Sequence, residues 1–341
     1  RFRSILSNKN IPKLNYPEFG DPKYLIVDGH KIPLSHFYKL SSLFYIIEAL
    51  EIEGREKKNL KCAEIGAGWG CLASLLIEQS YLSSYTDIDL PETLSLAAFY
   101  LTRNFPNLDS ILQTKTKTNP AFFTFSTPEF VNYIDEKYDL IINEASIAEM
   151  TRETASAYLD WIQNHLNKNG IFIWQNGRSR GKSDATVKMA DYDLARFKPI
   201  LLKPQRGKAS FQHGAALFIA AKLKDEEAID DKKLNFYYDV ITQLCEIGIT
   251  DDIISIYENL PKNKLSLNQI KYIEAIDSFF DSKNLESATK FCNSPNNDES
   301  LITSIYYLIG IKKFLDGNIK DSKINLDEYL EHGRSPLALA F

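Results

Sequence analysis

A short run of alternating glycines, Glu64-Ile-Gly-Ala-Gly-Trp-Gly70, constrains the fold of this chain more than any other feature. The residues before it, Asn59 to Ile65, can form a short buried strand, and those after it, Trp69 to Gln79, carry apolar side chains at helical spacing. The glycines therefore lie in a strand–loop–helix turn. Glycine adopts positive φ easily and lets the backbone approach a ligand, while the following helix presents free N–H groups and the positive end of its dipole. This geometry suits the polar tail of a nucleotide-like cofactor.

The spacing of the glycines separates two classes of cofactor. A dinucleotide fingerprint reads G-x-G-x-x-G, whereas here the spacing is G-x-G-x-G and Cys71 stands where the third glycine should be. With the leading Glu64, the run resembles motif I of the class I S-adenosylmethionine (SAM)-dependent methyltransferases. That resemblance implies that Glu64 lies near the amino group of SAM. It also implies that the loop backbone faces the methionine part of SAM through Gly66, Ala67, Gly68, Trp69 and Gly70. An ordinary tight turn without a ligand is the alternative.

Length, charge and cysteine content bound the class of protein. A chain of 341 residues favours two domains. The net charge of −5 and the lack of a basic run argue against nucleic acid as the main partner. The four cysteines form no C-x-x-C pair, which indicates a reduced, cytoplasmic protein without structural zinc. No apolar stretch reaches the roughly 18 residues of a membrane span, and no signal peptide is evident. The chain begins at Arg1 rather than Met, which leaves room for an upstream segment.

A carboxylate follows the glycine loop at the distance expected for a ribose-binding group. Ser83 to Asp89 reads as the second strand and runs into a helix whose first turn suits Pro91. A carboxylate about twenty residues beyond the loop, at a strand end, can accept two hydrogen bonds from a ribose diol. Asp87 and Asp89 both qualify. We prefer Asp89, because Asp89-Leu90-Pro resembles the ribose-binding corner of several O-methyltransferases; capping the next helix is its alternative role.

The rest of this region alternates strands with helices and predicts a Rossmann-like α/β sheet, mostly parallel, whose last strand is antiparallel. Ser126 and Thr127 follow the strand Phe122–Phe125, where the adenine would lie in a methyltransferase. A helix is expected over Thr151–Leu166, ended by Asn167–Gly170. The further expected strands are Tyr138–Ile142, Ile171–Trp174 and an antiparallel closing hairpin, Phe197–Leu202 with Ala215–Ala221.

The segment Arg1–Glu53 is predicted to form an N-terminal cap over the sheet on the substrate side. Tyr24–Val27 reads as a strand closed by an Asp-Gly turn, and Phe37–Leu50 reads as one amphipathic helix. His36 and Tyr38 then face a substrate. The alternative is that they are partly exposed residues at a helix start.

Three segments together carry a more specific resemblance. They are the glycine run, Asp89-Leu-Pro-Glu-Thr-Leu94 and Asn143-x-x-Ser146-x-x-Glu149-Met150. Together they resemble the sugar O-methyltransferases of bacterial surface-polysaccharide gene sets, over about Tyr16 to Lys222. The resemblance implies a SAM-dependent O-methyltransferase whose acceptor is a sugar, sugar nucleotide or glycan. The Ser146-to-Met150 element is its more discriminating part.

Methyl transfer to a hydroxyl needs an aligned acceptor and, usefully, a general base. Glu149 and His213 are the candidate bases, with helix capping and core packing as their alternative roles. Asn143 is a candidate to orient the substrate or SAM. Ser146 and Arg178 are candidates to bind substrate, and Arg178 opens a polar loop that extends to Tyr192. No cluster has metal-ligand spacing, so no metal is expected.

Residues 225–341 change to a helices-only pattern with a period of about 34–36 residues, which is tetratricopeptide-like. The chain is thus divided into a cap (1–53), a SAM-binding domain (54–224) and a helical-repeat domain (225–341). Such arrays bind peptides or other subunits, or only pack on the catalytic domain. The expected helix pairs are Leu234–Ile247 with Thr250–Leu260, Leu267–Phe280 with Leu285–Phe291, and Leu301–Leu315 with Ile319–Leu330.

Other functions remain open at this point. A methyltransferase of another small molecule or of a protein has the same signals. A nicotinamide-dependent oxidoreductase is disfavoured by the missing third glycine and by the absence of a Tyr-x-x-x-Lys pair near the fourth strand. A non-catalytic scaffold acting through the repeats is disfavoured by the intact glycine run and Asp89.

Overall fold

The computed structural model describes residues 16, 19, 22–27, 30–37, 39–116, 121–176, 196–205, 216–223 and 320. The chain divides into two compact units, and the first of them comprises Arg1–Lys188 and Phe197–Lys224. Tyr38, Arg178, His213 and the helical repeats predicted for 225–341 lie outside the described residues, apart from Lys320. The elements and the site described below belong to the first unit.

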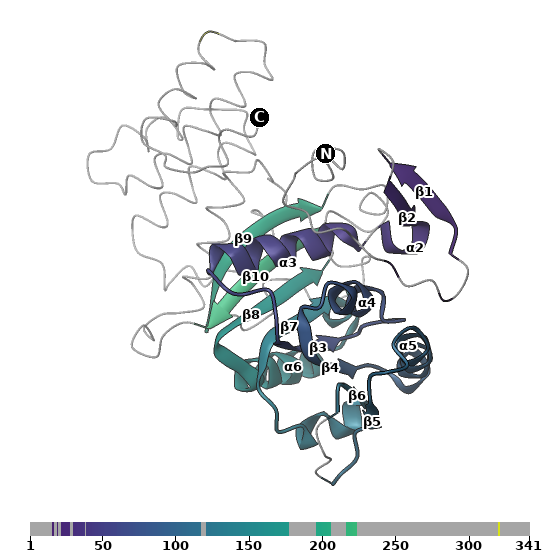
Figure 1. The fold of residues 1–341 in the computed structure, drawn as a ribbon. Helices are drawn as coiled ribbons and strands as arrows, with labels where there is room; N and C mark the ends of the chain where they lie inside the picture. The colour runs from purple at the N-terminus through teal and green to yellow at the C-terminus, as the bar shows by residue number, and fades with distance from the viewer. Residues whose placement is uncertain are drawn as a thin grey trace, which may run out of the picture. The chain divides into compact units, whose positions relative to one another are not determined.

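An eight-stranded sheet forms the centre of this unit (Figure 1), in the order β5-β6-β4-β3-β7-β8-β10-β9. All of its pairings are parallel except the two made by β10, which runs antiparallel to both β8 and β9. The predicted, mostly parallel sheet with an antiparallel closing hairpin is therefore confirmed. The edge strand β5 was not predicted from the sequence. The strands are β3 (Leu60–Ile65), β4 (Leu82–Ile88), β5 (Ser110–Leu112), β6 (Phe123–Ser126), β7 (Tyr138–Glu144), β8 (Leu166–Asn176), β9 (Phe197–Gln205) and β10 (Ala216–Leu223).

The strands are buried on both faces because helices cover the sheet on each side. One core joins the apolar faces of α3, α4 and α5 to inward side chains of the strands, among them Leu140, Ile142 and Phe218. On the other face Trp161 of α6 packs against Tyr138 of β7, with ring centroids 6.0 Å apart. The helices are α2 (Leu34–Phe37), α3 (Leu40–Ile52), α4 (Cys71–Glu78), α5 (Pro91–Asn104) and α6 (Arg152–His165), with 3-10 turns η1 (Pro128–Tyr133) and η2 (Ile147–Glu149).

The N-terminal segment differs in part from its prediction. The expected strand is present as β1 (Tyr24–Val27), and it pairs antiparallel with β2 (His30–Pro33), which was not predicted from the sequence. The helix expected over Phe37–Leu50 is present as α3, but it begins at Leu40, because Phe37 ends the separate short helix α2. Lys39 lies in the break, where its N–H donates to the carbonyl of His36 at 2.9 Å and its side chain turns toward Glu144 of β7. The ion pair thus joins the start of α3 to the end of β7.

The helix expected over Thr151–Leu166 is present as α6, and Asn167–Gly170, which were expected to follow its end, lie in the first part of β8. Asn167 is held there by a hydrogen bond from its Nδ2 to Asp139 Oδ1 of β7, at 3.0 Å. A Cβ on Gly170 would come within 2.9 Å of the Tyr138 carbonyl oxygen. Glycine at this position therefore avoids a clash with the Leu166 side chain and with the backbone of β7.

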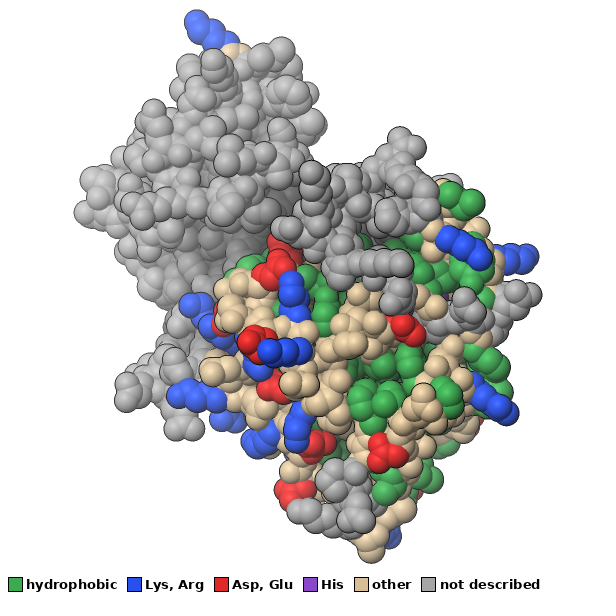
Figure 2. Space-filling view, in the orientation of Figure 1, with side chains coloured by type: hydrophobic (Ala, Val, Ile, Leu, Met, Phe, Trp, Pro, Cys, Tyr) green, Lys and Arg blue, Asp and Glu red, His purple; other side chains and the backbone are tan. Residues whose placement is uncertain are grey.

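The outer face of α5 is apolar. Leu96 and Phe99 are 55% and 51% exposed, and Figure 2 shows apolar side chains gathered over this side of the unit. The ring of Phe19 packs edge-on against Phe99, with centroids 5.6 Å apart.

Candidate functional site

The chain direction across the sheet reverses between β3 and β7. From β3 the chain proceeds through β4 and β6 on one side, and later through β7 and β8 on the other. In open α/β sheets ligands bind beyond the carboxyl ends of the strands at such a switch point. The polar residues that the structure places at these strand ends are Glu64, Asp89, Ser126, Asn143, Glu144 and Gln175.

The glycine loop lies at this switch point, and each of its three glycines has positive φ (+78°, +65° and +81° for Gly66, Gly68 and Gly70). A Cβ on Gly66 would lie 2.3 Å from Cβ of Ser146, and one on Gly70 would lie 3.0 Å from the side chain of Leu101. A Cβ on Gly68 would meet no atom of the described residues within 4 Å. Two glycines are therefore needed for packing inside the protein, while Gly68 leaves space on the open side of the loop.

Asp89 braces the loop. The N–H of Gly68 donates to its Oδ2 at 3.0 Å, and the N–H of Leu90 donates to its Oδ1 at 2.7 Å. Leu90, not Asp89, is the N-cap of α5, so the alternative in which Asp89 merely caps that helix is wrong. Burial raises the pKa of Asp89, while these two backbone hydrogen bonds lower it. Each carboxylate oxygen accepts more than one hydrogen bond, so Asp89 keeps capacity for a diol. Leu90 is 60% exposed and can cover an apolar ring edge.

Asp87, the other candidate for the ribose, belongs to the interior. It is fully buried, and it lies opposite Glu64 in the register of the parallel strands β3 and β4. Neither of its carboxylate oxygens has a hydrogen-bond partner among the described residues. Burial, followed by the charges of Glu64 and Asp89, raises its pKa well above the usual range. Asp87 therefore belongs to the packed interior beneath the loop and not to its open side.

Ser126 and Thr127 lie beside this corner, at the end of β6. The carbonyl of Ser126 accepts the N–H of Asp89 at 3.2 Å. Ser126 itself is fully buried and its Oγ donates to the carbonyl of Thr127 at 3.1 Å. The partly buried Thr127 is thus the member of this pair that has contact with solvent.

Glu64 is buried at the end of β3. Its Oε2 accepts a hydrogen bond from the hydroxyl of Tyr85 at 2.8 Å. Burial raises the pKa of Glu64 to about 7; the charge of Lys39 lowers it, that of Glu144 raises it, the Tyr85 bond lowers it and Asp89 raises it. Glu64 is therefore poised between its neutral and ionised forms near neutral pH.

An ion pair between a partly exposed lysine and a buried glutamate lies beside Glu64, and no motif in the sequence indicates it. Lys39 Nζ contacts Glu144 Oε2 across 105 positions of chain. Burial lowers the pKa of Lys39, but the nearby charges of Glu144 and Glu64 outweigh burial, so the pKa is raised overall. Next to this pair, Ser42 Oγ donates to Gln175 Oε1 at 3.0 Å. The start of α3 is thus tied to the ends of β7 and β8.

Asn143 and Ser146 join the two sides of the switch point. Both the Nδ2 of Asn143 and the Oγ of Ser146 donate to the carbonyl of Ile65, each at 2.9 Å. Asn143 is fully buried. Between them, Ala145 has a φ of +69°, a strained value for a residue with a Cβ. As the structure has them, Asn143 and Ser146 hold the end of β7 against β3 and the glycine loop; their predicted catalytic and substrate-binding roles stay predictions.

His36 lies in an aromatic cluster. It is 2% exposed, and its Nε2 lies 3.3 Å from both Ser74 Oγ and Tyr100 Oη. Its ring packs edge-on against Trp69 at 5.6 Å, and Trp69 packs against Tyr100 at 4.7 Å. Burial lowers the pKa of His36 to about 4, so it is neutral at pH 7. A substrate contact by His36 would require this cluster to open.

Glu149, a candidate base, is exposed at the end of η2. Its carboxylate is therefore accessible to an acceptor, and its catalytic role stays a prediction. His213, the other candidate base, lies outside the described residues, as do Tyr38 and Arg178.

The buried state of Glu64 predicts a pH effect on stability. Below pH 4.5 Glu64 is protonated in both states, whereas between 4.5 and about 7 the unfolded chain releases this proton and the folded chain keeps it. The free energy of unfolding should therefore fall as pH rises through this window, by about 3 kcal/mol from Glu64. Glu64→Gln keeps an acceptor for Tyr85 but cannot titrate. In urea denaturation, its free energy of unfolding should therefore differ less between pH 5 and pH 8 than that of the wild type. Glu51→Gln, at an exposed carboxylate of α3, is the control and should follow the wild type.

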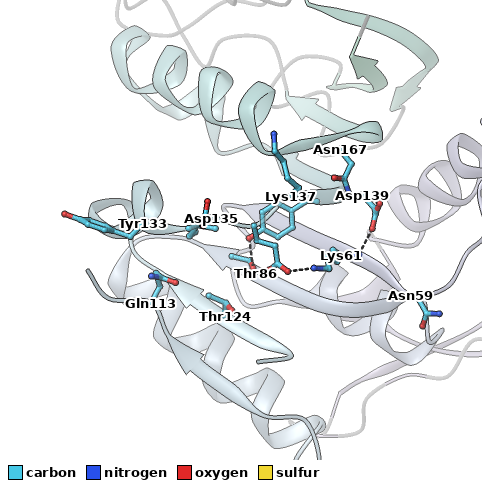
Figure 3. A pocket seen from close by; sticks show the side chains of 13 residues that line it. Asn59, Lys61, Thr86, Gln113, Thr124, Tyr133, Asp135, Lys137, Asp139 and Asn167 are labelled. Atoms are coloured by element: carbon cyan, nitrogen blue, oxygen red, sulfur yellow. Dashed lines mark hydrogen bonds and ion pairs between the residues drawn. The ribbon is translucent and has the colours of Figure 1, made fainter. Parts of the chain in front are cut away.

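A separate hollow of about 480 Å³ lies beside the amino ends of β3, β7 and β8 (Figure 3). Its wall is held by the ion pair between Lys61 and Glu136 at 2.6 Å, and by the hydrogen bond from Tyr138 Oη to Thr86 Oγ1 at 3.0 Å. Because sheets of this kind bind ligands beyond the carboxyl ends of their strands, this hollow is not the candidate site.

Neither a metal-ligand cluster nor a membrane span occurs in the part of the chain that the structure describes. Within those residues, no group of three or more His, Cys, Asp or Glu side chains is placed to hold a metal ion. In that same part of the chain, no helix combines the length and the apolar character that crossing a bilayer demands.

Comparison with known proteins gives distant likenesses in fold. No family model matches the chain, and no curated protein sequence matches it. Similar solved structures include magnesium protoporphyrin IX methyltransferase from Synechocystis PCC 6803 with bound SAH (14% identity, TM-score 0.40, covering 55% of this chain and 84% of that one). Another is an S-adenosylmethionine-dependent methyltransferase from Clostridium acetobutylicum ATCC 824 (14% identity, TM-score 0.37, covering 55% of this chain and 99% of that one). A third is the mitomycin 7-O-methyltransferase MmcR (13% identity, TM-score 0.36, covering 55% of this chain and 56% of that one).

Proposed function

We propose that the protein is a SAM-dependent methyltransferase. The observation that carries this proposal is the contact between the glycine loop and Asp89, in which Gly68 donates to Asp89 Oδ2 at the switch point of the sheet. A glycine loop on one strand end and a carboxylate on the next are the parts that a nucleoside-bearing cofactor requires.

The residues present fit such a cofactor. Gly68 has no side chain, so the space beside its Cα stays open for a ligand. Asp89 can accept further hydrogen bonds from a ribose diol. Leu90 and Thr127 would flank the base, and Glu64 would lie near the amino-acid end. When bound, SAM supplies a methyl group on a sulfonium. The chain's own task is then to align the acceptor, exclude water and take up the proton that the acceptor hydroxyl releases.

For the acceptor we propose a hydroxyl of a sugar, sugar nucleotide or glycan, with a role in bacterial surface-polysaccharide synthesis in the cytoplasm. This proposal is supported by the sequence resemblance through Asn143, Ser146 and Glu149. In it, Glu149 or His213 takes the proton, and His36, Tyr38, Ser146 and Arg178 contact the acceptor. The helical repeats predicted for 225–341 offer a surface for a protein partner. Another small molecule or a protein as acceptor is the alternative that the sequence left open.

Calorimetric titration with S-adenosylhomocysteine (SAH), with NAD as the parallel ligand, tests the proposal. We expect micromolar binding of SAH and none of NAD, because the loop lacks the third glycine of a dinucleotide site. Binding of NAD alone would make the protein an oxidoreductase. Binding of neither ligand would favour a scaffold that acts through its repeats.

A further inference from the structure

The two side chains of the ion pair between Lys39 and Glu144 differ in how far they are buried. The side chain of Glu144 is 3% exposed and that of Lys39 is 31% exposed. Oε2 of Glu144 contacts Lys39, but Oε1 is buried and has no hydrogen-bond partner among the described residues. Glu64, at the adjacent strand end, contributes a second carboxyl group close enough to influence Lys39 electrostatically.

Such an arrangement is incomplete as a purely structural feature. A buried carboxylate oxygen without a donor is destabilising, and native structures leave few of them. The Lys39 ammonium has three N–H donors, and Glu144 is its acceptor among the described residues. Within that part of the chain, Oε1 of Glu144 therefore lacks a donor, while the partly exposed ammonium of Lys39 keeps N–H groups that are open to solvent or to a ligand.

An α-amino acid zwitterion suits both groups. Its ammonium carries the missing donor and its carboxylate can accept from the open N–H groups, so an ion pair and a zwitterion complement each other with opposite charges facing. The location agrees with this chemistry, because Glu144 ends β7 and Glu64 lies near the end of β3, on the two sides of the switch point where a cofactor is expected.

We infer that Lys39 and Glu144 form the receptor for the amino-acid end of the cofactor, with Lys39 binding its carboxylate and Glu144, beside Glu64, binding its ammonium. The inference rests on the proposed function and extends it to two residues outside the glycine motif. One of them belongs to the segment that the sequence predicted to face the substrate. Adenosine derivatives that lack an amino acid should bind with the same affinity whether or not this pair is intact.

Two ligands separate this inference from the proposed function. SAH carries the amino acid, and 5′-methylthioadenosine carries the nucleoside and sulfur without it. In calorimetric titrations of the full chain we expect the isosteric Glu144→Gln to weaken SAH binding about tenfold or more, as for loss of one charge-assisted hydrogen bond. The affinity for 5′-methylthioadenosine should stay within about twofold. Lys39→Met should behave in the same way, and Lys58→Met, at an exposed lysine paired with Glu56, should change neither affinity.

Each outcome decides the matter. Unchanged SAH binding by Glu144→Gln and Lys39→Met would overturn the inference and leave the pair as a tie between α3 and β7. Equal loss of both ligands would overturn it as well, because the pair would then shape the whole site. Failure of the wild type to bind either ligand would refute the proposed function itself. Binding of 5′-methylthioadenosine also reports that a variant is folded, and if Lys39→Met does not fold, Glu144→Gln carries the test.

Discussion

Gly66→Ala should unfold the protein or leave it severely destabilised. The new Cβ would lie 2.3 Å from Cβ and 2.4 Å from Oγ of Ser146, at a φ of +78° that alanine resists. Ser146 cannot retreat easily, because its Oγ is bonded to the carbonyl of Ile65 and approached by Asn143. Overpacking and backbone strain together suggest a loss of about 3 kcal/mol or more. Urea denaturation measures this loss, or soluble yield where the variant does not accumulate.

Gly68→Ala is the matched control two residues away. It has a similar φ, +65°, but its Cβ would meet no atom of the described residues within 4 Å. Only the left-handed strain remains, about 1–2 kcal/mol, so this variant should fold. SAH binding should nevertheless weaken at least about tenfold, because the added methyl group takes the space left for the ligand. Wild-type affinity in Gly68→Ala would show that the ligand does not approach the loop there.

Asp89→Ala should weaken SAH binding about a hundredfold while the fold persists. The change removes the acceptor of a ribose diol and also frees the N–H of Gly68, so the loop loses its brace. Loss of hydrogen bonds to a charged group contributes about 1.5–3 kcal/mol each, which sets the scale of the effect. Calorimetry with SAH measures the affinity, and thermal melting verifies the fold.

Two further variants test the role of Asp89 more sharply. Glu92→Ala removes an exposed carboxylate in the first turn of α5 and should leave SAH binding unchanged. Asp89→Asn keeps one carbonyl acceptor for the loop and should fall between wild type and Asp89→Ala. An affinity of Asp89→Ala equal to that of the wild type would remove Asp89 from the ribose role, whatever the loop does.

Local signals account for what the sequence could predict. The strand before the glycine run, the helix after it and Pro91 in the first turn of α5 each depend on neighbours within a few residues. The same holds for the closing hairpin of β9 and β10. The three-residue edge strand β5 carried too few residues to show a periodicity.

Features set by distant parts of the chain could not be predicted in this way. The ion pair between Lys39, just before α3, and Glu144 joins residues 105 positions apart, and no local pattern indicates it. The choice between Asp87 and Asp89 depends on which of the two faces the interior, because both occupy plausible positions after the loop. The close packing of Ser146 against Gly66 likewise joins distant parts of the chain, and no local pattern indicates it.

The attachment of α3 has a practical consequence for anyone wishing to shorten this protein. Its inward side chains Leu40, Leu43, Ile46 and Leu50 are entirely buried. Its flanks are tied to the sheet through Lys39 to Glu144, Ser42 to Gln175 and Glu53 to Lys222. A truncation that starts at the glycine-loop strand would strip a layer from the hydrophobic core and leave Glu144 without its counter-charge. Expression trials should therefore keep the chain from before β1, even though the recognisable motif begins at Glu64.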